Sequence, residues 1–157
     1  MRSIFSKRIL YVLLILALIG GMVVAYFYFM PHRNVVDMNA EVTIEADALV
    51  KEYLDNADAA NNKYLSEEGE STILAVIGTV STITTDQNDQ RVVLLKNAEA
   101  NAGVSCTFTS ETNNQVKNIK EGERVRIKGV IRSGAGYDED LELYEDVIIE
   151  KCTVLKK

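Results

Sequence analysis

The chain is poor in the side chains that perform chemistry in enzymes. It has no tryptophan, one proline, one histidine and two cysteines in 157 residues. The histidine, His32, directly follows the proline, Pro31, after a long hydrophobic run, where it is predicted to be an interfacial residue. Without another histidine, no Ser-His-Asp or Cys-His arrangement can be built in the rest of the chain, which removes the commonest nucleophilic and acid–base machinery. The sequence therefore predicts that the protein is not an enzyme.

Motifs for metals and cofactors are also missing. Two isolated cysteines with no nearby histidine do not supply the four ligands of a zinc site. The stretch Gly134-Ala135-Gly136 joins two predicted strands, whereas a phosphate-binding loop lies between a strand and a helix. The acidic run Asp138-Glu139-Asp140 is predicted to be a solvated loop, because nothing around it indicates a desolvating pocket. We expect no cofactor and no metal.

A hydrophobic run near the N-terminus predicts a membrane segment. Residues 9–30 carry no charge, and as a helix they would span about 33 Å, slightly more than the hydrocarbon core of a bilayer. The run ends in Tyr26-Phe27-Tyr28-Phe29-Met30, which suits a membrane interface and lacks the small side chains that signal peptidase requires. No cysteine lies near Gly20-Gly21, so a lipoprotein cleavage box is absent. An uncleaved anchor is favoured over a cleaved signal peptide.

Charge is divided unevenly along the chain. Arg2, Lys7 and Arg8 precede the hydrophobic run and only Arg33 follows it closely, which holds the N-terminus in the cytoplasm. In a bacterium this predicts a single-pass protein of the inner membrane with an extracytoplasmic C-terminal domain. After Arg33, 13 basic residues face 23 acidic ones, a net charge of −10. So acidic a domain repels phosphate backbones, which weighs against nucleic acid as a partner.

A helix and a set of strands are predicted after the linker. Apolar residues recur at spacings of three and four from Leu49 to Tyr64, which predicts one amphipathic helix from about Ile44 to Tyr64 with Thr43 as its N-cap. The predicted organisation is a cytoplasmic N-terminus (1–8), a transmembrane helix (9–30), a linker (31–42), an amphipathic helix packed on a barrel (43–66) and the β-barrel (67–157).

The strand at 124–132 organises the predicted barrel. Its residues alternate between an apolar face and a mainly basic face, the pattern of a half-buried strand. Further strands are predicted at 72–85, 91–96, 104–109 and 147–155, with a connector at 111–119 and a flexible acidic loop at 133–140. Three meandering strands, a connector and two more strands are the layout of a five-stranded Greek-key barrel, the OB-fold. The fold class is mainly β.

Several stretches resemble the tRNA_anti-like OB-fold family. They are Ala60-Asn61-Asn62-Lys63-Tyr64-Leu65, Val76-Ile77-Gly78-Thr79-Val80, Cys106-Thr107-Phe108, the segment 122–129, and Glu145-Asp146-Val147-Ile148 leading to Cys152. The resemblance covers about residues 44–155 and implies an OB-fold in a small bacterial envelope protein. Because these residues form the barrel, the resemblance carries over no functional residue.

Basic residues on the central strand are the candidate binding face. Single-strand-binding OB-folds combine a positive groove with aromatic side chains on which bases stack. The strand at 91–96 has no aromatic residue, and Phe108 shares its face with Val104 and Cys106, as a core residue would. The alternative is an exposed strand face that is paired with nearby glutamates and protected from edge pairing. The residues of this candidate face are Arg124, Arg126, Lys128 and Arg132.

The two cysteines leave two alternatives open. Cys106 and Cys152 fall on strands that are neighbours in an OB barrel, and a disulfide is permitted outside the cytoplasm. The alternative is a pair of small buried thiols, since free cysteine packs well in cores.

The leading functional hypothesis is a non-enzymatic, membrane-anchored binding or assembly module of the cell envelope. Its partner would be a protein or a small ligand. The second hypothesis is a nucleic-acid-binding OB domain that uses the basic strand face, and an enzyme ranks third. The sequence does not indicate the oligomeric state.

Overall fold

The computed structural model describes residues 2–28, 35–66 and 71–155, and the chain divides into two units, residues 1–33 and 34–157. The first unit is a single helix, α1 (Arg2–Tyr28). Within it, Ile9–Tyr26 is long and apolar enough to cross a membrane, and none of this window is buried by protein. The end of the predicted membrane segment, Phe29-Met30, and the histidine His32 lie outside the described residues.

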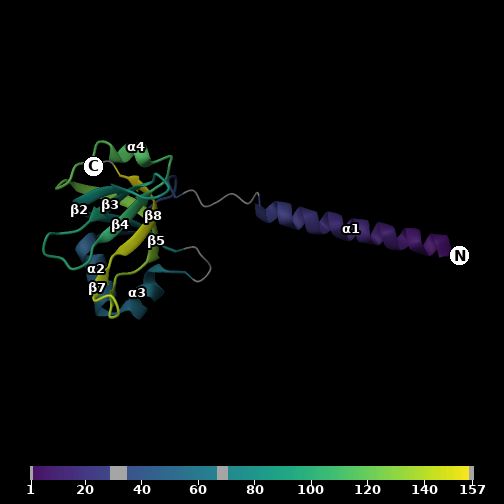
Figure 1. Ribbon diagram of the computed structural model, residues 1–157, viewed down its shortest axis with the longest axis horizontal. Helices are drawn as coiled ribbons and strands as arrows, with labels where there is room; N and C mark the ends of the chain where they lie inside the picture. The colour runs from purple at the N-terminus through teal and green to yellow at the C-terminus, as the bar shows by residue number, and fades with distance from the viewer. Residues whose placement is uncertain (1, 29–34, 67–70, 156–157) are drawn as a thin grey trace. The chain divides into compact units, whose positions relative to one another are not determined.

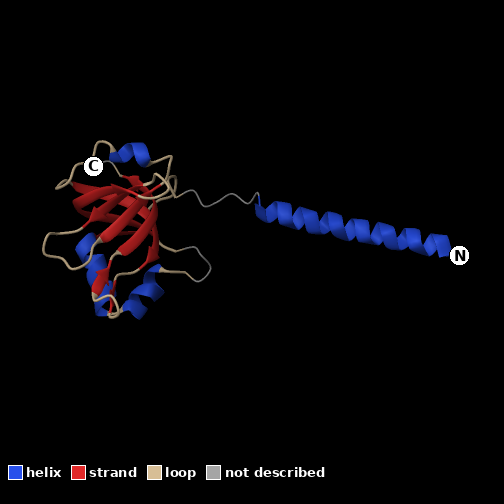
Figure 2. Ribbon diagram, viewed as in Figure 1, coloured by secondary structure: helices blue, strands red, loops and turns tan. Residues whose placement is uncertain are grey.

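The second unit is built on a closed five-stranded barrel (Figures 1 and 2). Its strands are β2 (Ile73–Thr85), β3 (Arg91–Leu95), β4 (Val104–Phe108), β5 (Arg124–Ser133) and β8 (Val147–Val154). They follow one another round the barrel as β2-β3-β4-β8-β5, and β5 pairs back to β2. The β4–β8 pair is parallel and the other four pairs are antiparallel. The predicted mainly β, OB-like barrel is confirmed.

Strand β2 closes the barrel because it is long enough to serve two partners. Its first half, from Ile73 to Thr79, pairs with β5, and its second half, from Val80 to Thr85, pairs with β3. The register shifts between Val80 and Thr82, where the strand changes partner. Such an irregularity bends a strand and increases its twist, as barrel closure requires.

The barrel interior is filled by the side chains that the alternation predicted. Along β3 and β4 every second residue is buried, from Val93 to Leu95 and from Val104 to Phe108. A short helix, α4 (Asn113–Val116), lies at one end of the barrel, and helices α2 (Ala46–Asp55) and α3 (Ala57–Tyr64) lie at the other (Figure 1). The core continues between these helices and the sheet.

The prediction of one helix from Ile44 to Tyr64 is wrong. Its first residues form strand β1 (Val42–Glu45), which runs parallel to β2, so Thr43 is not an N-cap. The rest is two helices that break at Asn56, whose side-chain oxygen accepts a hydrogen bond from Ala59 N at 3.0 Å. Asparagine competes for backbone donors and so favours a new helix start over the middle of a helix.

The loop predicted at 133–140 is also more ordered than expected. Strands β6 (Gly136–Asp138) and β7 (Leu143–Glu145) pair as an antiparallel hairpin between β5 and β8. The turn is shaped by Asp138, whose side-chain oxygen accepts hydrogen bonds from Asp140 N and Leu141 N at 2.9 and 3.0 Å. Strands of three residues are too short to show an alternation, which explains why the pattern missed them.

The hydroxyl of Tyr53 on α2 gives the fold a dependence on alkaline pH. The side chain is buried, and its hydroxyl has no hydrogen-bond partner within the described part of the chain. Burial raises the pKa of Tyr53 to about 12, from 10.0. Above pH 10 the Tyr53 hydroxyl ionises in the unfolded chain but not in the folded one. The free energy of unfolding therefore keeps its full value below pH 10 and falls as the pH rises towards 12.

Tyr53→Phe is therefore expected to stabilise the fold. Removing an unsatisfied buried hydroxyl should add about 1 kcal/mol at pH 7, because the group costs desolvation without gaining a partner. The loss of stability between pH 10 and 12 should also become shallower. Urea unfolding of both proteins at pH 7, 10 and 11.5 measures both effects, and a destabilised variant at pH 7 would contradict them.

Candidate functional site

The predicted basic face on β5 is occupied by contacts within the chain. Arg124 Nη2 lies 2.7 Å from both carboxylate oxygens of Glu45, and Arg126 Nη2 donates to Thr43 Oγ1 at 2.9 Å. Both acceptors belong to β1, the strand that the sequence placed in a helix. Arg132 Nε donates to Glu150 Oε2 on β8 at 2.9 Å. The three arginines are exposed, so an approaching phosphate would also meet the two glutamates.

Lys128 is not part of an exposed face at all. Its side chain is only 5% exposed, and Nζ donates to the backbone oxygen of Val36 at 2.9 Å and to that of Met38. The segment just before β1 thus covers the middle of the strand, and Val35 packs there with Val130 and Ile73. The prediction of one continuous basic row is wrong for this residue, because alternation assigns a face but does not tell what covers it.

Aromatic platforms for bases are missing from the barrel surface. Strands β3 and β4, both described in full, carry no aromatic residue on their outer sides, and Phe108 is fully buried. Within residues 35–66 and 71–155, the exposed aromatic side chains are Tyr137 and Tyr144. Base stacking is a major source of affinity for single strands. The outer sides of β3 and β4 therefore lack the aromatic part of a single-strand-binding site, and two of the exposed arginines of β5 are paired with glutamates.

Cys106 and Cys152 lie on neighbouring strands as predicted. Both are buried free thiols in the structure. Burial, followed by contact with the Cys106 thiol, raises the pKa of the Cys152 thiol. A thiol held neutral and out of solvent, as Cys152 is, is a poor nucleophile. The disulfide remains a prediction.

The hairpin β6–β7 concentrates exposed apolar side chains. Tyr137 and Tyr144 form a cross-strand pair with ring centroids 4.8 Å apart. Leu141 at the turn is 66% exposed, and Leu143 and Ile148 are exposed beside it. The same stretch carries six acidic residues: Asp138, Glu139, Asp140, Glu142, Glu145 and Asp146. Exposed apolar side chains among charges are typical of interaction surfaces.

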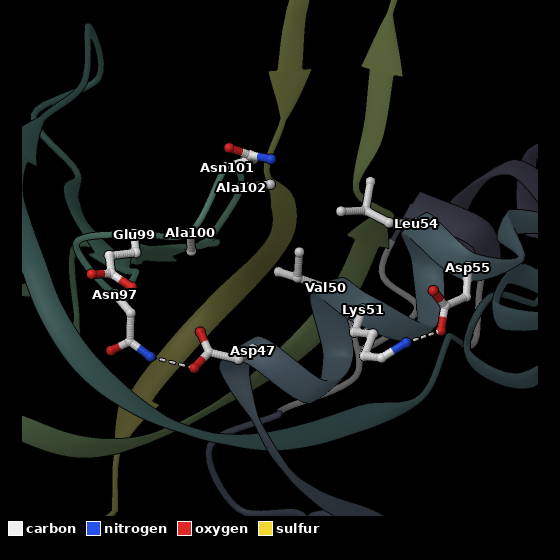
Figure 3. A pocket seen from close by; sticks show the side chains of 10 residues that line it. All are labelled: Asp47, Val50, Lys51, Leu54, Asp55, Asn97, Glu99, Ala100, Asn101 and Ala102. Atoms are coloured by element: carbon white, nitrogen blue, oxygen red, sulfur yellow. Dashed lines mark hydrogen bonds and ion pairs between the residues drawn. The ribbon is translucent and has the colours of Figure 1, made fainter.

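A cleft of about 500 Å³ lies between α2 and the loop that joins β3 to β4 (Figure 3). Its helix side carries Asp47, Val50, Lys51, Leu54 and Asp55, which share one face of α2 because they are spaced by three and four. Its loop side is formed by residues 97–102. Lys51 pairs with Asp55, and Asp47 accepts a hydrogen bond from the Asn97 side chain, which joins the two walls.

The hairpin, the β3–β4 loop and α2 meet at the same end of the barrel. Asp146 Oδ1, just after β7, accepts a hydrogen bond from Gly103 N at 2.7 Å. Asn97 at the other end of that loop contacts Asp47 on α2. Helix α2 and β6 are also neighbours. We call the surface formed by α2, residues 97–103 and the hairpin the acidic end of the barrel.

Comparison with known proteins identifies the family. A family model for tRNA_anti-like proteins matches residues 1–142. The chain belongs to the tRNA_anti-like family. The match includes helix α1, which lies outside the stretches behind the predicted resemblance, and it ends before β7 and β8. The family assignment from the sequence is therefore confirmed.

Solved structures support the fold of this tRNA_anti-like protein. Among 43 matching chains is a lipoprotein from Klebsiella pneumoniae subsp. pneumoniae MGH 78578, provisionally described as nucleic acid-binding. It is 16% identical, with a TM-score of 0.52, over 81% of this chain and 100% of that chain. A comparison with curated proteins gave no match. At this identity the likeness concerns the fold alone.

Metal chemistry finds no support in the described residues. Among them, no group of three or more histidine, cysteine, aspartate or glutamate side chains is placed to hold a metal ion.

Sequence patterns did not predict the acidic end of the barrel. The only signal for it was the run Asp138-Glu139-Asp140, and the cleft depends on a helix face and a loop that are separated by more than forty residues.

Proposed function

We propose that this protein is a membrane-anchored, non-enzymatic binding module that holds a protein partner at the acidic end of its OB barrel. Helix α1 would be the anchor, and the basic residues at its start, before the apolar run, favour a barrel outside the cytoplasm of a bacterium. One observation carries the proposal. Among the described residues of the barrel unit, five of the eight exposed large apolar side chains lie in or directly after the hairpin: Tyr137, Leu141, Leu143, Tyr144 and Ile148.

A protein partner fits this surface better than a nucleic acid does. Tyrosines are enriched among the residues that dominate binding energy at protein interfaces. Here they are surrounded by carboxylates, which repel phosphates. Two of the three exposed arginines of β5, Arg124 and Arg132, already pair with Glu45 and Glu150. Nucleic acid binding, the second hypothesis, is favoured only by the provisional description of the Klebsiella pneumoniae lipoprotein.

Photo-crosslinking in cells tests the proposal. A photoreactive amino acid at Leu141, at the tip of the hairpin, is expected to give a discrete crosslinked protein. The same amino acid at Glu111, an exposed position near α4, is the matched control and should not give this product. Replacing both Tyr137 and Tyr144 by alanine should reduce the product about tenfold or more, because loss of a tyrosine at the centre of an interface costs about 2 kcal/mol.

Two results would contradict the proposal. The first is equal crosslinking from Leu141 and Glu111, which would indicate random collisions. The second is a salt-sensitive shift of single-stranded DNA by micromolar protein that is lost in Arg124→Ala, which would revive the nucleic acid hypothesis.

Fusion of alkaline phosphatase to the C-terminus measures the orientation of the barrel in the membrane separately, and phosphatase activity is expected only if the barrel lies outside the cytoplasm.

A further inference from the structure

The cleft between α2 and the β3–β4 loop combines an apolar floor with a negative rim. Val50 and Leu54 point from α2 towards Ala100 and Ala102 on the loop (Figure 3). Leu54 is 41% exposed, although its neighbour Val50 is buried. Covering an exposed leucine in a concave site with a ligand removes apolar surface from water, which favours binding.

The carboxylates of the rim outnumber its cations, and one of the carboxylates has no bonding partner among the described residues. Three carboxylates, those of Asp47, Asp55 and Glu99, face one cation, Lys51. Asp47 is held by Asn97 and Asp55 by Lys51. No hydrogen bond or ion pair joins Glu99 to any residue that the structure describes, and Figure 3 shows its side chain on the loop wall. The cleft thus has a net negative charge and an unpaired carboxylate.

We infer that this cleft binds an arginine or lysine side chain that projects from the partner protein. The inference rests on the proposed function and specifies the chemistry of the partner. The charged head of such a side chain would reach Glu99 and its aliphatic stem would lie over Ala100, while the residues that flank it in the partner would cover Leu54 (Figure 3). Long basic side chains bury their stems and keep their heads at polar groups in this way. Their hydrogen bonds to carboxylates are charge-assisted.

The cost of opening the site is small. Lys51 and Asp55 form a pair between exposed side chains, which are 72% and 63% accessible. Such pairs contribute little to stability, so Lys51 can move aside at little cost when the ligand enters. An anion would instead meet three carboxylates. A cleft of about 500 Å³ also has room for the residues that flank the basic side chain.

The test uses the full chain in an uncharged detergent and a fluorescent hexa-arginine peptide as the probe. Fluorescence anisotropy measures the dissociation constant at fixed ionic strength. Glu99→Gln and Leu54→Ser should each weaken binding by about three- to fivefold, the range expected for one exposed charge pair or one partly buried side chain. Circular dichroism checks that both variants fold, which their exposed positions favour.

Glu111→Gln is the matched control. It removes one negative charge near α4, away from the cleft, and should change the dissociation constant by less than the cleft variants do. An equal loss in Glu111→Gln would show that only net charge attracts the peptide and would overturn the inference. So would the absence of binding at 1 mM peptide. If the peptide does not bind while a photoreactive amino acid at Leu141 still crosslinks to a protein, the inference of a basic side chain in the cleft is wrong and the proposed function stands.

Discussion

Gly134→Ala is expected to destabilise the barrel unit by about 3 kcal/mol, the upper part of the usual range for overpacking a core. A Cβ at Gly134 would lie 2.0 Å from Cε1 and 2.1 Å from Cδ1 of Tyr53. The whole ring would have to move, since Cγ would be only 2.8 Å away. The ring is buried against Tyr64, with centroids 6.1 Å apart, so it has little space to yield.

Thermal unfolding of the full chain measures this effect, and the melting temperature should fall by roughly 12 °C for a domain of this size. Gly136→Ala is the control, because the nearest atom to its Cβ would be Glu145 Oε2 at 3.8 Å. Equal melting temperatures for the two variants would mean that Tyr53 does not occupy the space beside Gly134. The same contact joins α2 to the start of the hairpin, so Gly134→Ala should also weaken crosslinking from Leu141.

Lys128→Ala is expected to destabilise the barrel unit by about 2–3 kcal/mol, because two backbone acceptors lose a buried, charged donor. The backbone oxygens of Val36 and Met38 would lose the bonds from Nζ, and the packed stem of the side chain would be lost too. The neighbouring Arg126 is exposed and, among the described residues, its side chain bonds to Thr43 Oγ1 alone, so Arg126→Ala should cost less than about 1 kcal/mol.

Urea unfolding compares the two variants, and hydrogen exchange locates the change. In Lys128→Ala the amide of Glu41, which donates to Ile73 O at 2.9 Å, should exchange faster. The contrast decides between two views of the basic residues. If both variants were equally stable and both lost affinity for single-stranded nucleic acid, the residues would form a binding face. The contacts of Lys128 favour a structural role.

The barrel was predictable because its strands obey simple patterns. The alternation along β3 and β4 identified the interior residues correctly, and on β5 it did so for Val125, Ile127 and Ile131 but not for the covered Lys128. The start of β2 is apolar on both parities, and both faces are indeed covered: Leu74 and Val76 join the main core, whereas Ile73 packs with Val35 and Val130. Local periodicity is sufficient where burial on each face is regular.

The errors arose where distant or very short segments decide the structure. Strand β1 has four residues and is recognisable only by its parallel partner β2. The break at Asn56 depends on a single side chain inside an otherwise helical pattern. Lys128 is covered by residues that precede it by about ninety positions, which no local pattern can show. The acidic end is assembled from three separate segments for the same reason.

The segment before the barrel has a mechanical consequence. A force applied to the chain N-terminal to Val35 would first have to break the packing of Val35. It would then have to break the hydrogen bonds of Lys128 to the backbone oxygens of Val36 and Met38, and then the pairing of β1 with β2. Only after these had given way would the force reach the strands that close the barrel. With α1 as the proposed anchor, residues 35–45 would therefore yield before the end of the barrel where we place the partner is distorted.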